Sequence, residues 1–258
     1  MRIWILNQYA YTPDQTAGTR HFSIAKKLIE KGHDVLVIAS SFYHKNREEL
    51  QKYDSEAYMH ENVYGVPYNY VRTPPYTGNR GGRVWNMLVF AFRVLRLTGL
   101  KNEPKPELII GTTPSPFSAI AAYKIARKYK IPFILEVVDI WPDTLMQVGN
   151  ISKWHPFVML LATIERKLYR EADAIYTHLE NAKDHFIQKG ASKHKIFFIP
   201  SAIPFDPIPE LKPLPENKVF TIIYVGAHGD VNDLGTLLEA ARILKDRGME
   251  QKIKFRLI

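Results

Sequence analysis

The chain contains the same sequence pattern twice, beginning once at Arg2 and again at Val219. In each copy an apolar run is followed by a loop with glycine, a helix-forming stretch and a second apolar run. The loop of the first copy holds Gly18, and the loop of the second copy holds Gly226 and Gly229. This order is typical of a βαβ unit, in which a helix joins two parallel strands. The sequence therefore predicts an α/β protein with two Rossmann-like, doubly wound parallel-sheet domains.

The two predicted domains differ in size. We expect a first domain over residues 1–200, an interdomain linker over 201–218 and the start of a second domain over 219–258. A chain of 258 residues with 46% hydrophobic content can bury one full core and part of another. A doubly wound domain usually needs roughly 100 residues or more. We therefore expect the second domain to be incomplete and the chain to be a fragment of a longer protein.

The two glycine loops are candidate ligand sites. In a parallel sheet the loop after the first strand lies at the carboxyl edge, where small residues let a ligand approach backbone N–H groups at a helix N-terminus. The first loop offers Thr16, Ala17, Gly18 and Thr19 for such an approach. Neither loop contains G-x-G-x-x-G or G-x-x-x-x-G-K-[ST], which argues against a dinucleotide fingerprint and against a Walker loop.

The excess positive charge of the chain is confined to its first half. The net charge is +9; residues 1–135 hold 19 basic and 10 acidic residues, whereas residues 136–258 hold 16 of each. Residues 62–102 include six basic residues, no acidic residue and many interleaved aromatic residues. Such a segment is compatible with docking on an anionic membrane surface. It is also compatible with a helix packed on a sheet whose arginines are simply solvated, and the residues leave both interpretations open.

Other classes of partner and location are less well supported. Nucleic-acid binding is disfavoured, because the basic residues match no reading motif and the second half is neutral. Arg93 and Arg96 interrupt the apolar run well short of the roughly 18 residues that a membrane span requires. The chain has no cysteine for a disulfide framework, and Met1 leads into a charged strand rather than a signal peptide. We expect cytoplasmic residence, with peripheral attachment to the inner face of the cell membrane as an option.

A candidate catalytic residue follows a later strand of the first domain. Residues 108–110 and 133–138 are predicted to be buried parallel strands, and residues 112–116 between them are predicted to supply a turn and a helix N-cap. Asp139 is the first charged residue beyond the second run, at the edge of the sheet that faces ligands, and Trp141 begins the loop that follows. Asp139 is therefore a candidate for catalysis or substrate contact, with a plain loop or N-cap residue as the alternative.

Two nearby carboxylates are weaker candidates. Glu136 lies inside the strand, where we expect a structural ion pair with an arginine, and Asp143 is expected to cap the next helix. The sequence has no D-x-D motif and no histidine pair spaced by three or four residues. A metal-dependent mechanism therefore has no visible ligands, and no cofactor is expected.

Several segments of the chain, taken in order, resemble a known enzyme family. They are QYAYTPDQTAGTRHFSIAKKLIEKGHDVLVIAS, EVVDIWPD, IERKLYREADAIYTHLENAKDHFIQKG, IPSAIPFD and YVGAHGDVNDLGTLLEAARIL. Together they resemble the retaining glycosyltransferases of family 4, which have the GT-B architecture of two Rossmann-like domains around a cleft. The most similar subgroup comprises bacterial enzymes that build O-antigen and capsule repeat units, such as N-acetyl-L-fucosamine transferases.

The resemblance implies a reaction and a set of site residues. The reaction is transfer of a sugar from a nucleotide donor, with a UDP-sugar favoured, to a lipid-linked or saccharide acceptor in surface polysaccharide biosynthesis, with retention at the anomeric carbon. The leaving phosphate helps to take the acceptor proton, and Asp139 would orient a hydroxyl of the acceptor or of the donor sugar. The implied substrate-binding residues are Gly18, Thr19, Arg20, His21, Thr113 and Trp141, and the implied donor-phosphate-binding residues are Gly226, His228 and Gly229.

The implied role of Arg20 or His21 is contact with an anion, and that of the second-loop residues is donation of backbone N–H groups to the leaving diphosphate. For His21 and His228 a solvated or helix-capping histidine is the alternative.

The chain departs from the family pattern at three places. Pro200, Ser201 and Ala202 stand where members commonly have P-N-G, and Val138 stands where members of the subgroup often have a basic residue. The Lys or Arg that grips the donor diphosphate and the Glu-x7-Glu motif of the family have no counterpart up to Ile258. We therefore expect the isolated chain to be inactive.

Two other functions stay open at this point. The main alternative is a non-catalytic binding module, in which the basic first domain captures a polyprenyl-diphosphate lipid or a partner subunit. A sugar-nucleotide epimerase is a more distant alternative, because G-x-G-x-x-G and a suitably placed Y-x-x-x-K pair are absent.

Overall fold

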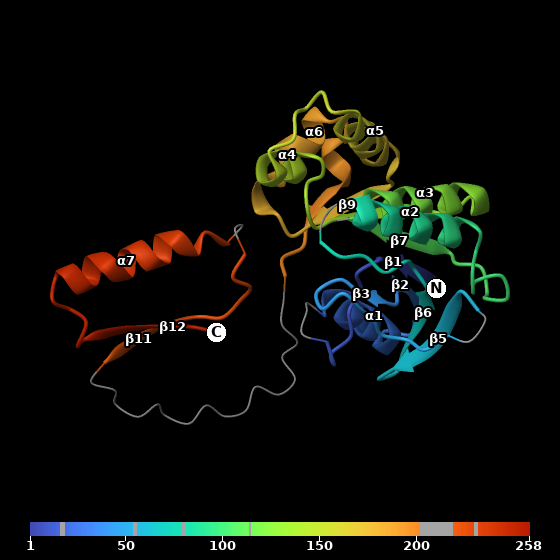
Figure 1. Cartoon of the computed structure of the whole chain (residues 1–258). Helices are drawn as coiled ribbons and strands as arrows, with labels where there is room; N and C mark the ends of the chain where they lie inside the picture. The colour runs from blue at the N-terminus through green and yellow to red at the C-terminus, as the bar shows by residue number, and fades with distance from the viewer. Residues whose placement is uncertain (16–18, 54–55, 79–80, 114, 202–218, 230–231) are drawn as a thin grey trace. The chain divides into compact units, whose positions relative to one another are not determined.

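The structure is a computed structural model that describes residues 1–15, 19–53, 56–78, 81–113, 115–201, 219–229 and 232–258, apart from the side chain of Val148. The chain divides into two compact units, Met1–Pro204 and Phe205–Ile258. Each unit contains the parallel βαβ element that the sequence predicts (Figure 1).

The first unit is built on an eight-stranded sheet in the order β10-β9-β8-β7-β1-β2-β6-β5. All neighbours are parallel except β5 and β6, which form an antiparallel hairpin. The strands are β1 (Arg2–Leu6), β2 (Asp34–Ser40), β5 (Tyr58–Val63), β6 (Val66–Val71), β7 (Leu108–Thr112), β8 (Phe133–Val137), β9 (Ala174–Thr177) and β10 (Ile196–Phe198). The antiparallel edge strand is an addition to the predicted parallel sheet. Its turn has two positive φ angles, 51° at Tyr64 and 87° at Gly65, as two-residue hairpin turns require.

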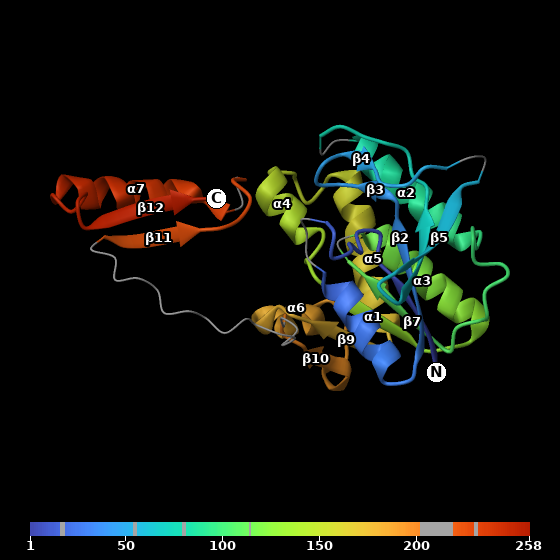
Figure 2. The same cartoon turned by 90° about the horizontal axis from the view of Figure 1, so that it is seen from below.

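The helices of the first unit lie on both faces of this sheet, as in a doubly wound fold (Figures 1 and 2). Helix α1 packs on one face, and α2 and α3 pack together on the other, with α5 against α3. The helices are α1 (Arg20–Glu30), α2 (Gly81–Leu95), α3 (Pro116–Tyr129), α4 (Asp143–Gly149), α5 (Pro156–Glu171) and α6 (Lys183–Gln188). A small antiparallel pair, β3 (Phe42–Tyr43) and β4 (Glu48–Glu49), follows β2.

Two hydrophobic cores fill the space between the helices and the sheet. Alternate residues of a strand point to opposite faces, so Ile3 and Ile5 join the core beneath α1, whereas Trp4 and Leu6 join the core beneath α2 and α3. Burial on both faces explains why the strands read as continuous apolar runs rather than as alternating patterns.

The chain order reverses at the centre of the sheet. From β1 the chain continues to β2 and then to the β5–β6 hairpin on the same side, and it then returns to β7 on the other side of β1 and proceeds outward to β10. In open α/β sheets, ligands bind at the carboxyl ends of the strands that flank such a reversal. The loops after β1, β7 and β8 are therefore the first place to look for a site.

Helix α3 begins as the sequence predicts. Ser115 is its N-cap and accepts a hydrogen bond from the Ser118 N–H at 3.4 Å, with Pro116 at the first helical position. The helix lies so close to β7 that a Cβ added at Gly111 would be 2.7 Å from the Ala122 Cβ. Glycine is thus required for this helix-to-strand packing.

The second unit consists of β11 (Phe220–Tyr224), α7 (Leu234–Asp246) and β12 (Ile253–Leu257), with the two strands paired in parallel. None of the residues described in this unit is buried. Within the described parts of both units, no helix is long and apolar enough to cross a membrane.

Candidate functional site

A buried carboxylate lies at the centre of the switch-point region. Glu136, the fourth residue of β8, is fully buried and accepts three hydrogen bonds. Its donors are the Arg20 Nε at 2.8 Å, the His21 Nε2 at 2.5 Å and the Thr112 hydroxyl at 2.9 Å. Arg20 and His21 open α1, so this cluster joins the first turn of that helix to β7 and β8. The predicted ion pair between Glu136 and an arginine is confirmed, with Arg20 as the partner.

The proton position on His21 follows from its other neighbour, Asn7. The Tyr9 backbone N–H donates to the Asn7 Oδ1 at 2.9 Å, so the Asn7 Nδ2 faces His21 and donates to its Nδ1 at 2.9 Å. Nδ1 is therefore an acceptor, and the ring proton lies on Nε2, where it is donated to Glu136. The Nε2–H of His21 thus points at the Glu136 carboxylate.

The environment of Glu136 fixes its charge. Burial of the carboxyl would raise its pKa, but the neighbouring His21 ring and Arg20 guanidinium outweigh this effect and hold the pKa at about 2. Arg20 also donates to the carbonyls of Ile199 and Pro200, each at 3.3 Å. It therefore ties the end of the first unit to the same cluster.

These contacts define the environments of Arg20 and His21. Both side chains hydrogen-bond a carboxylate of the protein, and His21 is buried rather than solvated, while their implied contact with a substrate anion stays a prediction. Of the other first-loop residues, Thr19 is the residue before α1 and makes no side-chain cap, whereas Gly18 lies outside the described residues.

Asp139 lies where the sequence places it, two residues beyond the end of β8, with its side chain exposed. The Thr113 hydroxyl holds the backbone of this loop. It accepts from the Val138 N–H at 3.0 Å and donates to the Asp139 carbonyl at 3.2 Å. Thr113 is itself buried, so its hydroxyl positions Asp139 in this structure, and a substrate contact by Thr113 stays a prediction.

The carboxyl of Asp139 has an unusual environment for an exposed group. The surrounding protein raises the pKa of Asp139 by desolvation, while the positive charge of Arg83 and the nearby His178 act in the opposite direction. Asp139 therefore binds a proton more readily than an ordinary aspartate does. A raised pKa next to a cation, at the carboxyl edge of the sheet, is a combination often found at functional sites.

Arg83 lies between two aromatic rings from different loops. Its guanidinium carbon is 5.8 Å from the Tyr9 ring centre and 5.9 Å from the Trp141 ring centre. Arg83 belongs to the first turn of α2, Tyr9 follows β1, and Trp141 follows β8 and precedes a cis bond to Pro142. The predicted site residue Trp141 is thus brought beside Arg83 and the loop of Asp139.

Further aromatic side chains extend this cluster. The His44 ring lies 5.7 Å from the Tyr9 ring and 5.7 Å from the Tyr76 ring, and the Tyr76 hydroxyl donates to the His44 Nδ1 at 2.6 Å. Burial, with the charges of Arg83 and Arg47, lowers the pKa of His44 to about 4. His44 is therefore neutral at physiological pH, and its Nδ1 can accept from the tyrosine.

A buried polar network holds α2 against the strand ends. The Asn86 side chain donates to the Thr73 hydroxyl at 2.8 Å and to the Pro74 carbonyl at 2.7 Å, and its Oδ1 accepts from the Gln8 Nε2 at 2.5 Å. Asn86 lies one turn after Arg83, so the network fixes the position of that guanidinium. We define the Arg83 site as Tyr9, His44, Tyr76, Arg83, Asp139 and Trp141.

Only Asp139 and Trp141 of the Arg83 site were predicted from the sequence. Tyr9 and His44 were not singled out, and Tyr76 and Arg83 lie in residues 62–102, for which a membrane-docking surface and a packed helix were both left open. Tyr68, Tyr70 and Phe90 of that segment are in fact buried. The available signal was positional: Tyr9, His44 and Tyr76 each come shortly after the end of a strand, namely β1, β3 and β6.

Asp143 does not cap the following helix, and that prediction is wrong. Pro142 is the N-cap of α4, and Asp143 is the first helical residue with no capping hydrogen bond. Its Oδ2 lies 3.6 Å from the His185 Nδ1, and the His185 Nε2 is bonded to the buried Glu165 at 2.9 Å. Asp143 thus belongs to a polar cluster that joins α4, α5 and α6.

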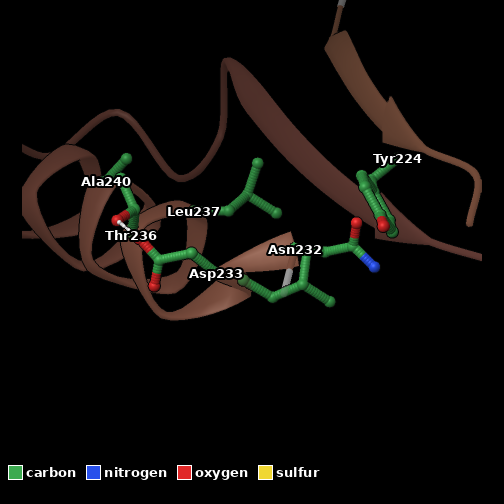
Figure 3. A pocket seen from close by; sticks show the side chains of 7 residues that line it. Tyr224, Asn232, Asp233, Thr236, Leu237 and Ala240 are labelled. Atoms are coloured by element: carbon green, nitrogen blue, oxygen red, sulfur yellow. Dashed lines mark hydrogen bonds between the residues drawn. The ribbon is translucent and has the colours of Figure 1, made fainter. Parts of the chain in front are cut away.

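The second unit has a hollow at the carboxyl end of β11, with a volume of about 470 Å³ (Figure 3). It is lined by Tyr224, Asn232, Asp233, Leu234, Thr236, Leu237 and Ala240. The Thr236 hydroxyl donates to the Asp233 Oδ2 at 2.8 Å, and the Asn232 side chain donates to the Ala227 carbonyl at 2.7 Å. The hollow is thus formed by the glycine loop and the first turns of α7.

The three predicted phosphate-binding residues of this loop have different environments. The Gly226 N–H donates to the Ile258 carbonyl at 3.1 Å, so in this structure it is not the phosphate donor that we expected. His228 is exposed, with its ring 6.1 Å from that of Tyr224. Gly229 is also exposed, and its backbone is open: no described atom lies within 4 Å of an added Cβ. Phosphate contacts by His228 and Gly229 stay predictions.

Among the residues that the structure describes, no three or more histidine, aspartate or glutamate side chains are grouped so that they could hold a metal ion.

Comparisons with known proteins place this geometry in a family. The sequence profile described as "Glycosyl transferase 4-like domain" matches residues 16–202. The chain is similar to the "Putative colanic acid biosynthesis glycosyl transferase WcaI" of Escherichia coli strain K12, with 25% identity over 254 residues. The match includes 92% of this chain and 61% of WcaI, so the chain spans about three fifths of that relative's length.

Solved structures show the same fold at low sequence identity. HepE from Anabaena, solved with UDP-glucose, matches with a TM-score of 0.50 and 13% identity over 100% of this chain and 69% of HepE. Sucrose-phosphate synthase from Thermosynechococcus elongatus matches with a TM-score of 0.58 and 11% identity over 98% of this chain and 69% of that protein. The lipopolysaccharide outer core galactosyltransferase WaaB matches with a TM-score of 0.52 and 14% identity over 100% of this chain and 68% of WaaB.

The fold is therefore that of the GT-B glycosyltransferases, matched over part of their length. Because the family profile covers most of the first unit and includes Glu136 and the Arg83 site residues Asp139 and Trp141, the chain belongs to the glycosyl transferase 4-like family.

Proposed function

We propose that the chain provides the acceptor side of a retaining glycosyltransferase that moves a sugar from a nucleotide donor, a UDP-sugar by preference, to a lipid-linked or saccharide acceptor. The process that we infer is synthesis of a surface polysaccharide in the cytoplasm. Family membership supports transfer to an acceptor, and the names of WcaI and WaaB support the polysaccharide context. The crystallised complex of HepE with UDP-glucose supports the donor class.

The observation that carries the proposal is the Arg83 site. It combines an exposed carboxylate of raised pKa, a guanidinium and several aromatic rings at the switch point of a parallel sheet. Aromatic faces pack on sugar rings and on isoprenoid chains, and a guanidinium matches the geometry of a diphosphate. These groups fit an acceptor that carries a sugar, a diphosphate and an apolar chain.

The proposed step needs only groups of the substrates and Asp139. Asp139 accepts a hydrogen bond from the attacking hydroxyl of the acceptor and so orients it toward the anomeric carbon. The bond from that carbon to the donor diphosphate breaks, and the bond to the acceptor oxygen forms on the same face of the sugar. The proton of the acceptor hydroxyl passes to the leaving diphosphate. Asp139 contributes orientation and electrostatic stabilisation rather than a covalent intermediate.

The donor diphosphate is assigned to the loop after β11, where Gly229 offers open backbone and His228 is exposed. The Gly226 N–H would have to leave Ile258 before it could contribute.

The first test measures binding of the acceptor by the chain. Tryptophan fluorescence reports this binding as the chain is titrated with a polyprenyl-diphosphate-linked monosaccharide. Arg83→Gln is expected to weaken binding by about 10- to 100-fold, because a charged hydrogen bond to phosphate is lost. The matched control is Arg72→Gln, which removes the same charge from an exposed arginine that packs on Tyr53. Equal effects of the two substitutions would refute an acceptor site at Arg83.

Because the isolated chain is expected to be inactive, transfer is measured with a form extended through a complete second domain, as UDP released from a UDP-sugar in the presence of that acceptor. Asp139→Asn is expected to lower the rate by at least about 100-fold while the fold is kept, because Asp139 is exposed. Unchanged turnover would remove Asp139 from the mechanism. Acceptor binding that depends on Arg83 with no UDP release by the extended form would instead favour the non-catalytic binding module.

A further inference from the structure

Two helices on the same face of the sheet expose large apolar side chains. On α2, Trp85 is 59% exposed and Phe92 is 53% exposed. Trp154, just before α5, is 72% exposed, and Leu160 on α5 is 50% exposed. Leu88 and Met159 are exposed beside them. Trp85, Leu88 and Phe92 are spaced by three and four residues, so they form one stripe opposite the buried face of α2. We call this set of six side chains the apolar stripes.

The two stripes belong to one surface. α3 packs against both α2 and α5. α2 follows β6, α3 follows β7, and α5 follows β8 by way of α4 and leads into the parallel strand β9, so all three helices begin toward the carboxyl edge of the sheet (Figures 1 and 2). Trp85 is in the first two turns of α2, and Trp154 comes just before α5. The sequence analysis considered only the first of these stripes.

Basic side chains accompany the apolar stripes. The Arg96 guanidinium lies 4.5 Å from the Phe92 ring centre, and the Lys153 Nζ lies 5.3 Å from the Trp154 ring centre. The second half of α5 carries a hollow of about 370 Å³, lined by Thr163, Arg166, Lys167, Arg170 and Glu171. The three cations in this hollow offer a place for an anionic headgroup.

Acidic side chains do not balance this charge. α2 and α3 contain no acidic residue, and α5 contains two, Glu165 and Glu171. Glu165 is buried and bonded to His185, and Glu171 is paired with Arg127 at 2.7 Å. The surface is therefore both apolar and positive.

We propose that the outer surface of α2, α3 and α5 docks on an anionic lipid bilayer, with the apolar stripes in the interface and the cations of α5 among the headgroups. Tryptophan and leucine side chains next to Lys and Arg are the composition of interfacial helices. Each cation near an anionic surface adds to the attraction. A second copy of the chain fits this face less well, because a two-fold contact would bring two positive surfaces together.

Docking would bring a lipid to the Arg83 site. Arg83 and Trp85 lie two residues apart on α2, so the guanidinium of the site and an interfacial side chain belong to the same end of one helix. This consequence rests on the proposed function, whereas docking itself does not, and the experiments below measure docking without any sugar.

The first experiment tests the role of the positive charge. It measures co-sedimentation of the chain with anionic vesicles of phosphatidylglycerol and phosphatidylcholine, and with neutral vesicles of phosphatidylcholine alone. The pair of substitutions Arg166→Gln and Lys167→Gln is expected to lower the partition coefficient for the anionic vesicles by about 30-fold. The matched control is Lys26→Gln with Lys31→Gln, which removes two exposed charges at α1 on the opposite face of the sheet. Equal losses in the two pairs, or equal binding to both kinds of vesicle, would overturn the proposal.

The second experiment tests the role of the apolar side chains, with the double variant Trp154→Ser and Leu160→Ser. The control is the double variant Phe220→Ser and Val225→Ser, at exposed apolar positions of the second unit. The first pair is expected to lower anionic-vesicle binding by about tenfold or more, and the control pair by less than about twofold. Light scattering measures the mass of each protein in solution. If the chain does not bind vesicles but forms a dimer that the first pair disrupts, the occupant is a second copy and the membrane proposal is wrong.

Discussion

Replacing Glu136 with glutamine tests the electrostatic core of the switch-point region. Glu136 presents two acceptor oxygens to three donors, from Arg20, His21 and Thr112. Glutamine has one acceptor oxygen and one NH2 group, so in either orientation the NH2 faces a donor. If the NH2 faces Arg20, the clash cannot be relieved, because a guanidinium does not give up its proton. If it faces His21, the ring must accept on Nε2, and Nδ1–H then faces the Asn7 Nδ2.

The size of the effect follows from the pKa. Burial opposes ionisation, but His21 and Arg20 lower the pKa of Glu136 from 4.5 to about 2. This shift corresponds to about 3 kcal/mol of folding free energy at pH 7. Because the folded pKa is lowered, the stabilisation is present above the unfolded pKa and is lost as the pH falls toward 2. At pH 3.5 about 2 kcal/mol remains. We therefore expect Glu136→Gln to cost about 3 kcal/mol at pH 7, and less as the pH falls.

Urea unfolding followed by tryptophan fluorescence measures this directly, since all four tryptophans (Trp4, Trp85, Trp141 and Trp154) lie in the first unit. The matched control is Glu171→Gln, which breaks a more exposed pair with Arg127 and is expected to cost less than about 1 kcal/mol. The reasoning is refuted if Glu136→Gln unfolds at the same urea concentration as the unaltered chain. A cost that is the same at pH 7 and pH 3.5 would also refute it, because the loss would then not come from ionisation.

Three other perturbations test the local structure. Gly111→Ala is expected to cost about 2 kcal/mol in the same urea assay, since the added Cβ would lie 2.7 Å from that of Ala122. Thr113→Val removes the hydroxyl that holds the loop of Asp139, and a loss of about 1 to 2 kcal/mol is expected, with turnover reduced as well. Burial lowers the pKa of His44 to about 4, so its ring resonances in an NMR titration are expected to stay unchanged between pH 5 and 8 and to shift only as the pH falls through about 4; a midpoint near 6.5 would contradict this.

The sequence predicted the features that depend on local patterns. The two βαβ units, the strand before Asp139 and the N-cap at Ser115 all follow from periodicity and from residue preferences within a few positions. The ion pair of Glu136 was also predictable in kind, because a charged residue inside a buried strand needs a partner.

Most of the contacts that the sequence did not predict are long-range. Arg20 and His21 are 116 and 115 residues away from Glu136 along the chain, so the loop sequence alone could not show that both side chains are used by a protein carboxylate. The Gly226 N–H is likewise taken by Ile258, the partner that the parallel pairing of β11 and β12 provides. The prediction for Asp143 failed because the preceding Pro142 takes the N-cap position itself.

Glu136 and Asp139 show how one strand can end in two carboxylates of opposite character. Glu136 is surrounded by donors that lower its pKa, so it stays ionised and has no lone pair directed at solvent. Asp139, three residues later, is exposed and has a pKa that desolvation raises, although His178 and Arg83 act in the opposite direction. A change at position 136 is therefore expected to act on stability first, whereas under the proposed function a change at position 139 is expected to lower turnover with little effect on stability. The number of donors that the fold aims at a carboxylate, rather than its place in the motif, decides which of these roles it has.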